Sequence, residues 1–168
     1  MDVKFHKLSD LERIKFSDLL ADAYSFDKNL VDAEIERWRK DNDNLFYDYV
    51  GSETADTCCI ITTLNDEIIG FICWDPRSLP RYAIIGDNCI ITKYKGKGYG
   101  KVQLKEAINR IMRNGGKKVF VSTSNANGFI PAQRMYESVG FKKLDNSTLQ
   151  PWQIEQKQDI YYSMDICR

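Results

Sequence analysis

The sequence has few of the residues that build metal sites, disulfide frameworks or charged surfaces. Its 168 residues include one histidine, His6, and five cysteines that form no CxxC pair. This spacing excludes the common zinc motifs, and we expect no metal site. Basic and acidic residues number 24 each, so the formal net charge is zero. No overall field attracts nucleic acid or an anionic membrane, and we expect neither as a partner.

Long apolar runs are also missing. The N-terminal stretch MDVKFHKL carries charges throughout, unlike the apolar centre of a signal peptide. No uncharged apolar run approaches the length that spans a bilayer. We therefore expect a cytoplasmic protein in a reducing compartment. There, Cys58, Cys73 and Cys89, which lie in strand-like runs, are expected to be small buried apolar residues rather than disulfide partners.

Turn signals divide the chain into short segments, and 168 residues with 43% hydrophobic content suit one core. We predict a single domain over residues 1–168. Alternating or β-branched runs predict seven strands, at 3–8, 57–64, 68–74, 82–92, 118–122, 141–144 and 160–166. Helical spacing predicts four helices, at 10–24, at 30–40, from the glycine-rich turn to Asn114, and from Pro131 to Gly140. This order predicts an α/β (α+β) fold with a mixed, mostly antiparallel sheet and one parallel crossover.

A glycine-rich turn joins a predicted strand to the third predicted helix. The stretch ITKYKGKGYGK begins at Ile91 and places glycine at 96, 98 and 100. The first N–H groups of a helix have no intrahelical acceptors, so a strand, a glycine turn and a helix together can hold an anion. The spacing fits neither a P-loop nor a dinucleotide fingerprint, which disfavours a nucleotide-binding switch. A tight turn with solvated lysines remains an alternative.

Two motifs resemble the GNAT superfamily of acetyl-CoA-dependent N-acetyltransferases. The first is YKGKGYGK after the strand NCIIT, and the second is PAQRMYESVGF on the following helix. The family signature is Arg/Gln-x-x-Gly-x-Gly/Ala, and here Lys95 takes the first place. A lysine keeps the positive charge but loses the two-pronged geometry of arginine. The order of elements extends the resemblance over nearly the whole chain.

The resemblance implies a GNAT-like domain that uses acetyl-CoA as cosubstrate and needs no metal. The acetyl group would pass directly to a primary amine of a small-molecule or peptide acceptor. The backbone of Ile90 and Ile91 would pair with the pantetheine amides, and Tyr136 would protonate the departing thiolate. The pyrophosphate would be held by the turn residues Lys95, Gly96, Lys97, Gly98, Tyr99, Gly100 and Lys101.

Other positions leave more than one interpretation open. Tyr136 shares its predicted helix face with Ala132 and Met135, so it is equally readable as a core residue. Asp87 and Asn88 lie where relatives place a base or a water-holding residue, and alternation lets at most one of them face the cleft. Asp87 could instead be a solvated strand residue.

The family often has an asparagine seven residues before this tyrosine, where this chain has Phe129. Asn125 or Asn127 could supply the missing polar contact to CoA. Cys89 could act as a nucleophile, although a strand cysteine more often packs in a core. Aromatic residues could line an acceptor pocket or fill the core, namely Tyr24, Phe26, Trp38, Trp74 and Trp152.

The position of Lys95 and the absent asparagine also allow a second function. The chain could be a CoA-sensing or regulatory module that binds acyl-CoA without useful turnover. The sequence does not identify the acceptor amine. It does not fix the oligomeric state either, and a homodimer is one option.

Overall fold

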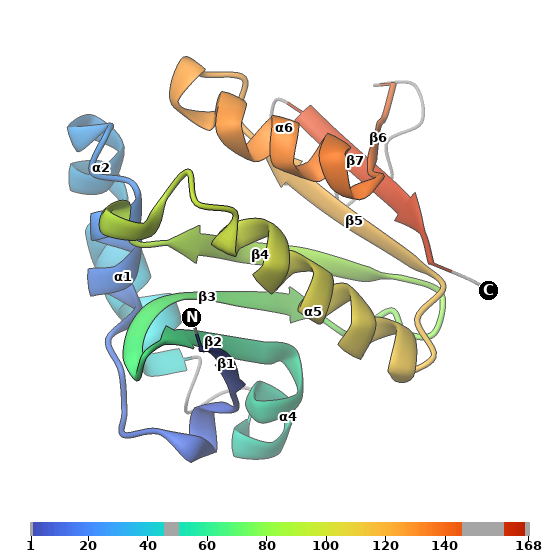
Figure 1. Ribbon diagram of the computed structural model, residues 1–168, viewed down its shortest axis with the longest axis horizontal. Helices are drawn as coiled ribbons and strands as arrows, with labels where there is room; N and C mark the ends of the chain where they lie inside the picture. Colours follow the sequence, from blue (N-terminus) through green and yellow to red (C-terminus); the bar gives the residue numbers. More distant parts are fainter. Residues whose placement is uncertain (1, 46–50, 146–159, 167–168) are drawn as a thin grey trace. The chain divides into compact units, whose positions relative to one another are not determined.

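Seven strands form one mixed sheet in the computed structural model, which describes residues 2–45, 51–145 and 160–166 (Figure 1). The strand order is β1-β2-β3-β4-β5-β7-β6. β4 runs parallel to β5, whereas β1–β2, β2–β3, β5–β7 and β6–β7 are antiparallel. The predicted mixed sheet with one parallel crossover is therefore confirmed. The strands are β1 (Val3–His6), β2 (Cys59–Leu64), β3 (Glu67–Asp75), β4 (Ala83–Ile90), β5 (Lys118–Thr123), β6 (Lys142–Lys143) and β7 (Ile160–Asp165).

The chain divides into two compact units, which are described separately below. The first unit consists of Met1–Cys73 and Asp87–Gln103, and the second of Trp74–Gly86 and Leu104–Arg168. The boundaries of a single domain over 1–168 stay a prediction. Five α-helices are described, namely α1 (Phe16–Ala23), α2 (Lys28–Trp38), α4 (Gly51–Cys58), α5 (Tyr99–Arg113) and α6 (Ile130–Val139). None of the helices in the described residues is long and apolar enough to cross a membrane.

The first helix is shorter than the predicted span of 10–24. In the sequence, Ser9 and Glu12 have the spacing of a capping box, which places the N-cap at Ser9. In the structure Ser9 lies before the helix, and its N–H donates to the carboxylate of Asp56 in α4 at 2.8 Å. Asp43 supplies the cap instead, because its carboxylate accepts from the N–H of Ser17 at 2.8 Å and from the Ser17 hydroxyl. A carboxylate from a distant segment therefore sets the start of α1, and local sequence does not reveal it.

The second helix ends in an unusual segment. Asp27 caps α2 by accepting from the N–H of Leu30 at 3.1 Å. After Trp38 the backbone widens into a π-helical segment, Arg39–Leu45. Helix α4 then leads into β2, so residues 57 and 58, which the β-branched run predicts as strand, end a helix instead. This helix was not predicted.

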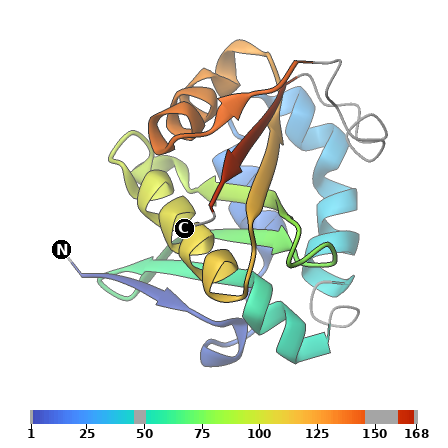
Figure 2. The same cartoon turned by 90° about the vertical axis from the view of Figure 1, so that its right-hand side faces the viewer.

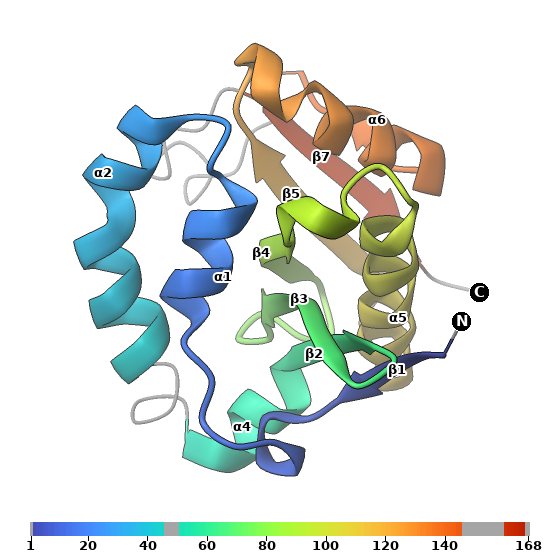
Figure 3. The same ribbon diagram turned by 60° about the vertical axis from the view of Figure 1, so that its left-hand side comes forward.

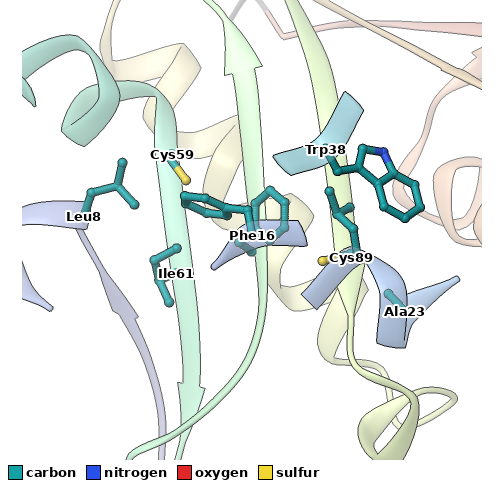
Figure 4. Packing of buried hydrophobic residues seen from close by; sticks show 9 residues of the cluster. Leu8, Phe16, Ala23, Trp38, Cys59, Ile61 and Cys89 are labelled. Carbon is teal, nitrogen blue, oxygen red and sulfur yellow. The ribbon is translucent and has the colours of Figure 1, made fainter. Parts of the chain in front are cut away.

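Helices α1 and α2 lie on one side of the strands of the first unit (Figure 3). Their apolar side chains pack against these strands (Figure 4). Phe16 meets Phe71 edge to face with ring centroids 4.7 Å apart. The cluster consists of Leu8, Phe16, Leu20, Ala23, Trp38, Cys59, Ile61, Phe71 and Cys89. Cys58, Cys59, Cys73 and Cys89 are all free thiols. The expectation of buried apolar cysteines therefore holds for Cys58 and Cys89, while Cys73 is partly exposed.

The opposite face of the same strands carries a buried polar network around Gln103, which lies in the first turns of α5 and is 0% exposed. The Gln103 Oε1 accepts from the hydroxyl of Thr62 at 2.5 Å. Its Nε2 donates to the Phe71 carbonyl at 2.8 Å and to Asn88 Oδ1 at 2.7 Å, with the Cys89 carbonyl at 3.3 Å. One side chain thus joins α5 to β2, β3 and β4.

The second unit is built around β5, β7 and α6. β7 lies between β5 and β6 and pairs with β5 along six residues of each strand (Figure 2). β6 is only two residues long, shorter than the predicted 141–144. Helix α6 ends at Gly140 with φ at 113°, a left-handed conformation that glycine adopts without strain. This confirms the predicted end of the helix.

We predict that Gln103→Met destabilises the protein by about 2–4 kcal/mol, because it leaves the Phe71 carbonyl and the Asn88 amide oxygen buried without donors. Urea unfolding followed by circular dichroism measures the change. Gln133→Met is the matched control, since Gln133 lies in α6, is only partly buried and donates to a single carbonyl, that of Ser124, at 2.9 Å. It should cost about 1 kcal/mol or less. Equal losses in the two variants would contradict the structural role of the network.

Candidate active site

The glycine-rich turn adopts the conformation that its glycines permit. The backbone leaves β4 through a 3-10 turn at Thr92–Tyr94 and enters α5 at Tyr99. Gly96 has φ at 72° and Gly98 has φ at 87°, values that strain any residue with a Cβ atom. Apart from the adjoining residues of the chain, no described protein atom lies within 4 Å of a Cβ built at either position. The turn therefore leaves open space on its surface.

Only some of the turn residues predicted to hold the pyrophosphate have N–H groups that are available to a ligand. The Lys95 N–H donates to the Thr92 carbonyl at 3.2 Å, and the Lys101 N–H donates to the Gly98 carbonyl at 3.1 Å. In the part of the chain that the structure describes, the N–H groups of Gly96, Lys97, Gly98 and Gly100 donate to no acceptor. These four groups precede or begin a helix of 15 residues, where the helix dipole favours negative charge. The N–H groups of Lys95 and Lys101 are not available for the predicted contact.

The ammonium group of Lys95 also has a protein partner. It donates to the carbonyl of Ala23, the last residue of α1, and lies 4.9 Å from the centroid of the Phe26 ring. Partial burial lowers the pKa of Lys95. A cation at a helix C-terminus is favourable because the last carbonyls lack donors. In this structure Lys95 joins the turn to α1, which differs from the phosphate contact expected from its position in the motif.

The remaining side chains of the turn form an aromatic and basic surface. The Tyr94 hydroxyl donates to Glu67, which also accepts from the Lys93 ammonium at 3.0 Å. The hydrogen bond from Tyr94, followed by that from Lys93, lowers the pKa of Glu67. Lys97 lies 5.2 Å from the centroid of the Tyr94 ring, and the Tyr94 and Tyr99 rings are 6.1 Å apart. These contacts hold the turn against β3.

The end of β4 offers fewer free backbone groups than expected. The Ile91 N–H donates to the Ile69 carbonyl at 2.8 Å, and the Ile91 carbonyl accepts from the Tyr94 N–H at 2.9 Å. Both backbone groups of Ile91 therefore have a protein partner, and its pairing with a ligand stays a prediction. Ile90, which is 8% exposed, remains the candidate for that contact.

Pairing between β4 and β5 is short. The register covers only Ala83 opposite Val119 and Ile84 opposite Phe120. Within the described residues of the second unit, Ile85 and Gly86 have no partner on β5, although β5 continues to Thr123. The pairing of the two parallel strands thus ends at Ile84.

Asp87 and Asn88 point to opposite faces of β4, as the alternation predicts. Asp87 is half-buried, and its carboxylate accepts from the side-chain amide of Asn42 at 2.9 Å. Burial raises the pKa of Asp87, while the hydrogen bond from Asn42 and the charge of Arg37 act in the opposite direction. Asp87 is thus a partly exposed strand residue whose carboxylate is held by a hydrogen bond. A carboxylate of this kind can accept a proton nearer to neutral pH than an exposed one.

Asn88 faces α5. Its Oδ1 accepts from Gln103, which fixes the orientation of the amide and makes Nδ2 the donor end. The Nδ2 atom is buried and has no hydrogen-bond partner among the described residues. Because one end of the amide is held by a buried network, Asn88 is placed as a supporting polar residue rather than as a base.

Tyr136 and Asn125 belong to the second unit, whereas the turn, Asp87 and Asn88 belong to the first. Tyr136 lies on α6, is 5% exposed, and packs against Phe141 and Tyr162 with ring centroids 5.8 and 5.9 Å away. Its packing in an aromatic cluster supports the core interpretation without excluding a role for its hydroxyl. Asn125 is exposed in the loop after β5.

Cys89, the candidate nucleophile of the sequence analysis, is poorly suited to attack. Cys89 is 3% exposed and faces α1, and burial raises the pKa of its thiol. The thiol therefore stays protonated at neutral pH, and only the thiolate is a strong nucleophile. Cys59 is equally buried, and its pKa is also raised by burial. The described residues hold no cluster of three His, Cys, Asp or Glu side chains able to bind a metal.

The predicted aromatic pocket residues are mostly core residues. Tyr24 stacks on Trp38 with ring centroids 5.6 Å apart, and Trp38 and Trp74 are each 4% exposed. Phe26, at 49% exposed, is the large apolar residue that remains open to solvent near Lys95. Trp152 lies outside the described residues.

Comparison with known proteins identifies a shared fold. The model of the acetyltransferase (GNAT) family matches residues 16–141. No curated protein matches the sequence at a significant level. An acetyltransferase of the GNAT family from Staphylococcus aureus Mu50 is 17% identical, with a TM-score of 0.74 over 99% of this chain and 100% of that one.

Two further solved structures contain coenzyme A or acetyl-CoA. The PaiA N-acetyltransferase from Thermoplasma acidophilum, in complex with coenzyme A, is 17% identical with a TM-score of 0.72, covering 98% of this chain and 99% of that one. A GNAT family acetyltransferase from Elizabethkingia anophelis with acetyl-CoA bound is 19% identical with a TM-score of 0.62, covering 98% of each chain. At these identities the likeness shows the fold.

We predict that iodoacetamide leaves Cys59 and Cys89 unmodified in the native protein at neutral pH, because both thiols are buried and protonated. Peptide mass spectrometry before and after unfolding in urea measures the labelling. Both cysteines should become labelled once the chain is unfolded. Rapid labelling of Cys89 in the native state would instead identify a reactive thiolate and revive the nucleophile hypothesis.

Proposed function

We propose that this chain, which belongs to the acetyltransferase (GNAT) family, transfers the acetyl group of acetyl-CoA directly to a primary amine of a small molecule or peptide. The observation that carries the proposal is the glycine-rich turn. Its four available N–H groups stand at the start of α5, and its two positive-φ glycines leave room for a ligand. This arrangement suits a pyrophosphate, since backbone donors and the helix dipole both favour negative charge.

Different segments of the chain would contact different parts of CoA. Gly96, Lys97, Gly98 and Gly100 would donate to the pyrophosphate through their N–H groups, and Tyr99 and Lys101 would border it. Backbone groups of Ile90, at the end of β4, would meet the pantetheine amides. The ligands present in the structures from T. acidophilum and E. anophelis support CoA as the ligand class.

Acetyl transfer requires a neutral amine, a stabilised tetrahedral intermediate and a proton for the thiolate. The amine nitrogen attacks the carbonyl carbon of the thioester, the carbon–sulfur bond breaks, and the amine loses one proton. We assign that proton to the carboxylate of Asp87, whose raised pKa favours acceptance. We assign the proton that the departing thiolate gains to the hydroxyl of Tyr136.

Direct transfer needs no covalent enzyme intermediate, and the burial of Cys89 supports it over a two-step scheme. Because Asp87 must be ionised to act, kcat/KM should rise with pH through its raised pKa, above the range of an exposed aspartate. The alternative function, a CoA-binding sensor without turnover, has one observation in its favour. Lys95 contacts Ala23 rather than remaining available to a phosphate.

The first test of the proposal is Gly98→Ala. Gly98 has φ at 87°, and an alanine there would shift the turn and place a methyl group on its open face. We expect CoA affinity to fall about tenfold or more by calorimetry, which corresponds to about 1.4 kcal/mol or more. Gly115→Ala is the matched control, because Gly115 has a similar φ of 83° but lies after the other end of α5. Both variants should lose about 1–2 kcal/mol of stability, while only Gly98→Ala weakens CoA binding.

The second test is Tyr136→Phe, which removes the hydroxyl and keeps the ring against Phe141 and Tyr162. We expect kcat to fall roughly 100-fold with little change in CoA affinity, as for loss of a general acid. Tyr162→Phe is the control, since it removes a hydroxyl that donates to Glu137 at 3.2 Å within the same aromatic cluster. That variant should retain its kcat. A Tyr136→Phe enzyme that turns over at the wild-type rate would make Tyr136 a core residue only.

A further inference from the structure

We propose that Asn42 is a positioning residue that holds Asp87 as an oriented carboxylate, and that the π-helical segment Arg39–Leu45 places Asn42 against β4. The inference rests on the proposed role of Asp87 as the proton acceptor. Its basis is the hydrogen bond of 2.9 Å between the Asn42 amide and the Asp87 carboxylate. Asn42 is 9% exposed, so this contact is largely removed from water.

The π-helical segment is anchored independently of Asn42. Asp43, the next residue, accepts from the N–H of Ser17 at 2.8 Å and from its hydroxyl. The Asp43 carbonyl also accepts from the guanidinium of Arg13 at 2.6 Å. Wide helical turns of this kind frequently occur at functional sites. Here two successive side chains make different contacts. Asp43 binds the segment to α1, and Asn42 binds it to β4.

The chemistry of the two side chains sets the direction of the hydrogen bond. An ionised carboxylate only accepts, so the Asn42 group at 2.9 Å must be its NH₂. Among the described residues, Asn42 supplies the one side-chain hydrogen bond to Asp87. A hydrogen bond to the charged form favours ionisation, whereas burial opposes it. Asn42 therefore keeps a half-buried carboxylate available to accept a proton.

Other groups around Asp87 do not replace this contact. Arg37 of α2 favours the ionised form through its charge alone. The thiol of Cys89 lies on β4 itself, and those of Cys59 and Cys73 lie on β2 and β3. Burial raises the pKa of all three thiols, so they are neutral at physiological pH. Arg37 is the charged neighbour of Asp87 and Asn42 is its hydrogen-bond donor, so removal of the Asn42 amide should raise the pKa of Asp87.

The experiment compares wild-type protein with Asn42→Ala and Asn42→Gln, the second of which retains an amide donor. The carboxyl carbon of Asp87 is followed by NMR over a pH titration, and kcat/KM is measured over the same range. In Asn42→Ala the pKa of Asp87 should rise by about one pH unit, as expected for the loss of one hydrogen bond to a charged group. The pH at which kcat/KM begins to fall should rise by the same amount. Below the pKa of Asp87, kcat/KM of Asn42→Ala should be about tenfold lower than that of the wild type, and at higher pH the two should be equal.

Two controls separate positioning from folding. Lys40→Ala changes an exposed side chain of the same segment and should leave both titrations as in the wild type. If Asn42→Ala does not fold, Asn42→Leu replaces it, since leucine has the same branched arrangement of side-chain heavy atoms as asparagine and lacks the donor. Asn42→Gln should lie closer to the wild type than either.

The NMR titration needs no acceptor amine, so it decides the inference even if turnover is absent. An unchanged pKa of Asp87 in folded Asn42→Ala would overturn the positioning role and leave the proposed function intact. A shifted pKa without any amine-dependent transfer in the wild type would support the contact and remove the proposed function.

Discussion

Alternation of side chains along β4 is the constraint on which the candidate site depends. Asp87 and Cys89 face α1 and α2, and Asn88 between them faces α5. One strand therefore offers a carboxylate to one face and an amide to the other. Each polar group is held from a different helix, Asp87 through Asn42 and Asn88 through Gln103. A one-residue change of register would exchange the two faces and lose both contacts.

The glycine-rich turn follows from the same strand and carries a different kind of chemistry. Its glycines contribute conformation and space, while the available donors are backbone N–H groups. The lysines around it have structural contacts, since Lys95 lies at the end of α1 and Lys93 at Glu67. The proposed anion site would depend on backbone geometry and the helix dipole more than on side-chain charge. Such a site is compatible with a chain of zero formal net charge.

The sequence predicted those features that depend on neighbouring residues. The turn, the helix after it, the end of α6 at Gly140 and the parallel crossover are all encoded in short patterns. Long-range contacts were not predictable in the same way. Asn42 lies 45 residues before Asp87, and Gln103 meets Thr62 across 41 residues, so no spacing marks either pair. The start of α1 was misplaced for the same reason, because Asp43 caps it from a segment that follows α2.

The proposed function requires that bound acetyl-CoA give up its acetyl group to an amine. The most direct measurement incubates the protein with acetyl-CoA carrying an isotope-labelled acetyl group and with a panel of primary amines, and follows free thiol and labelled amide together. Direct acetyl transfer predicts thiol release that depends on an amine, with one labelled amide formed per thiol released. Tight CoA binding with no amine-dependent release would contradict it and identify a sensor, and release without amide formation would identify a hydrolase.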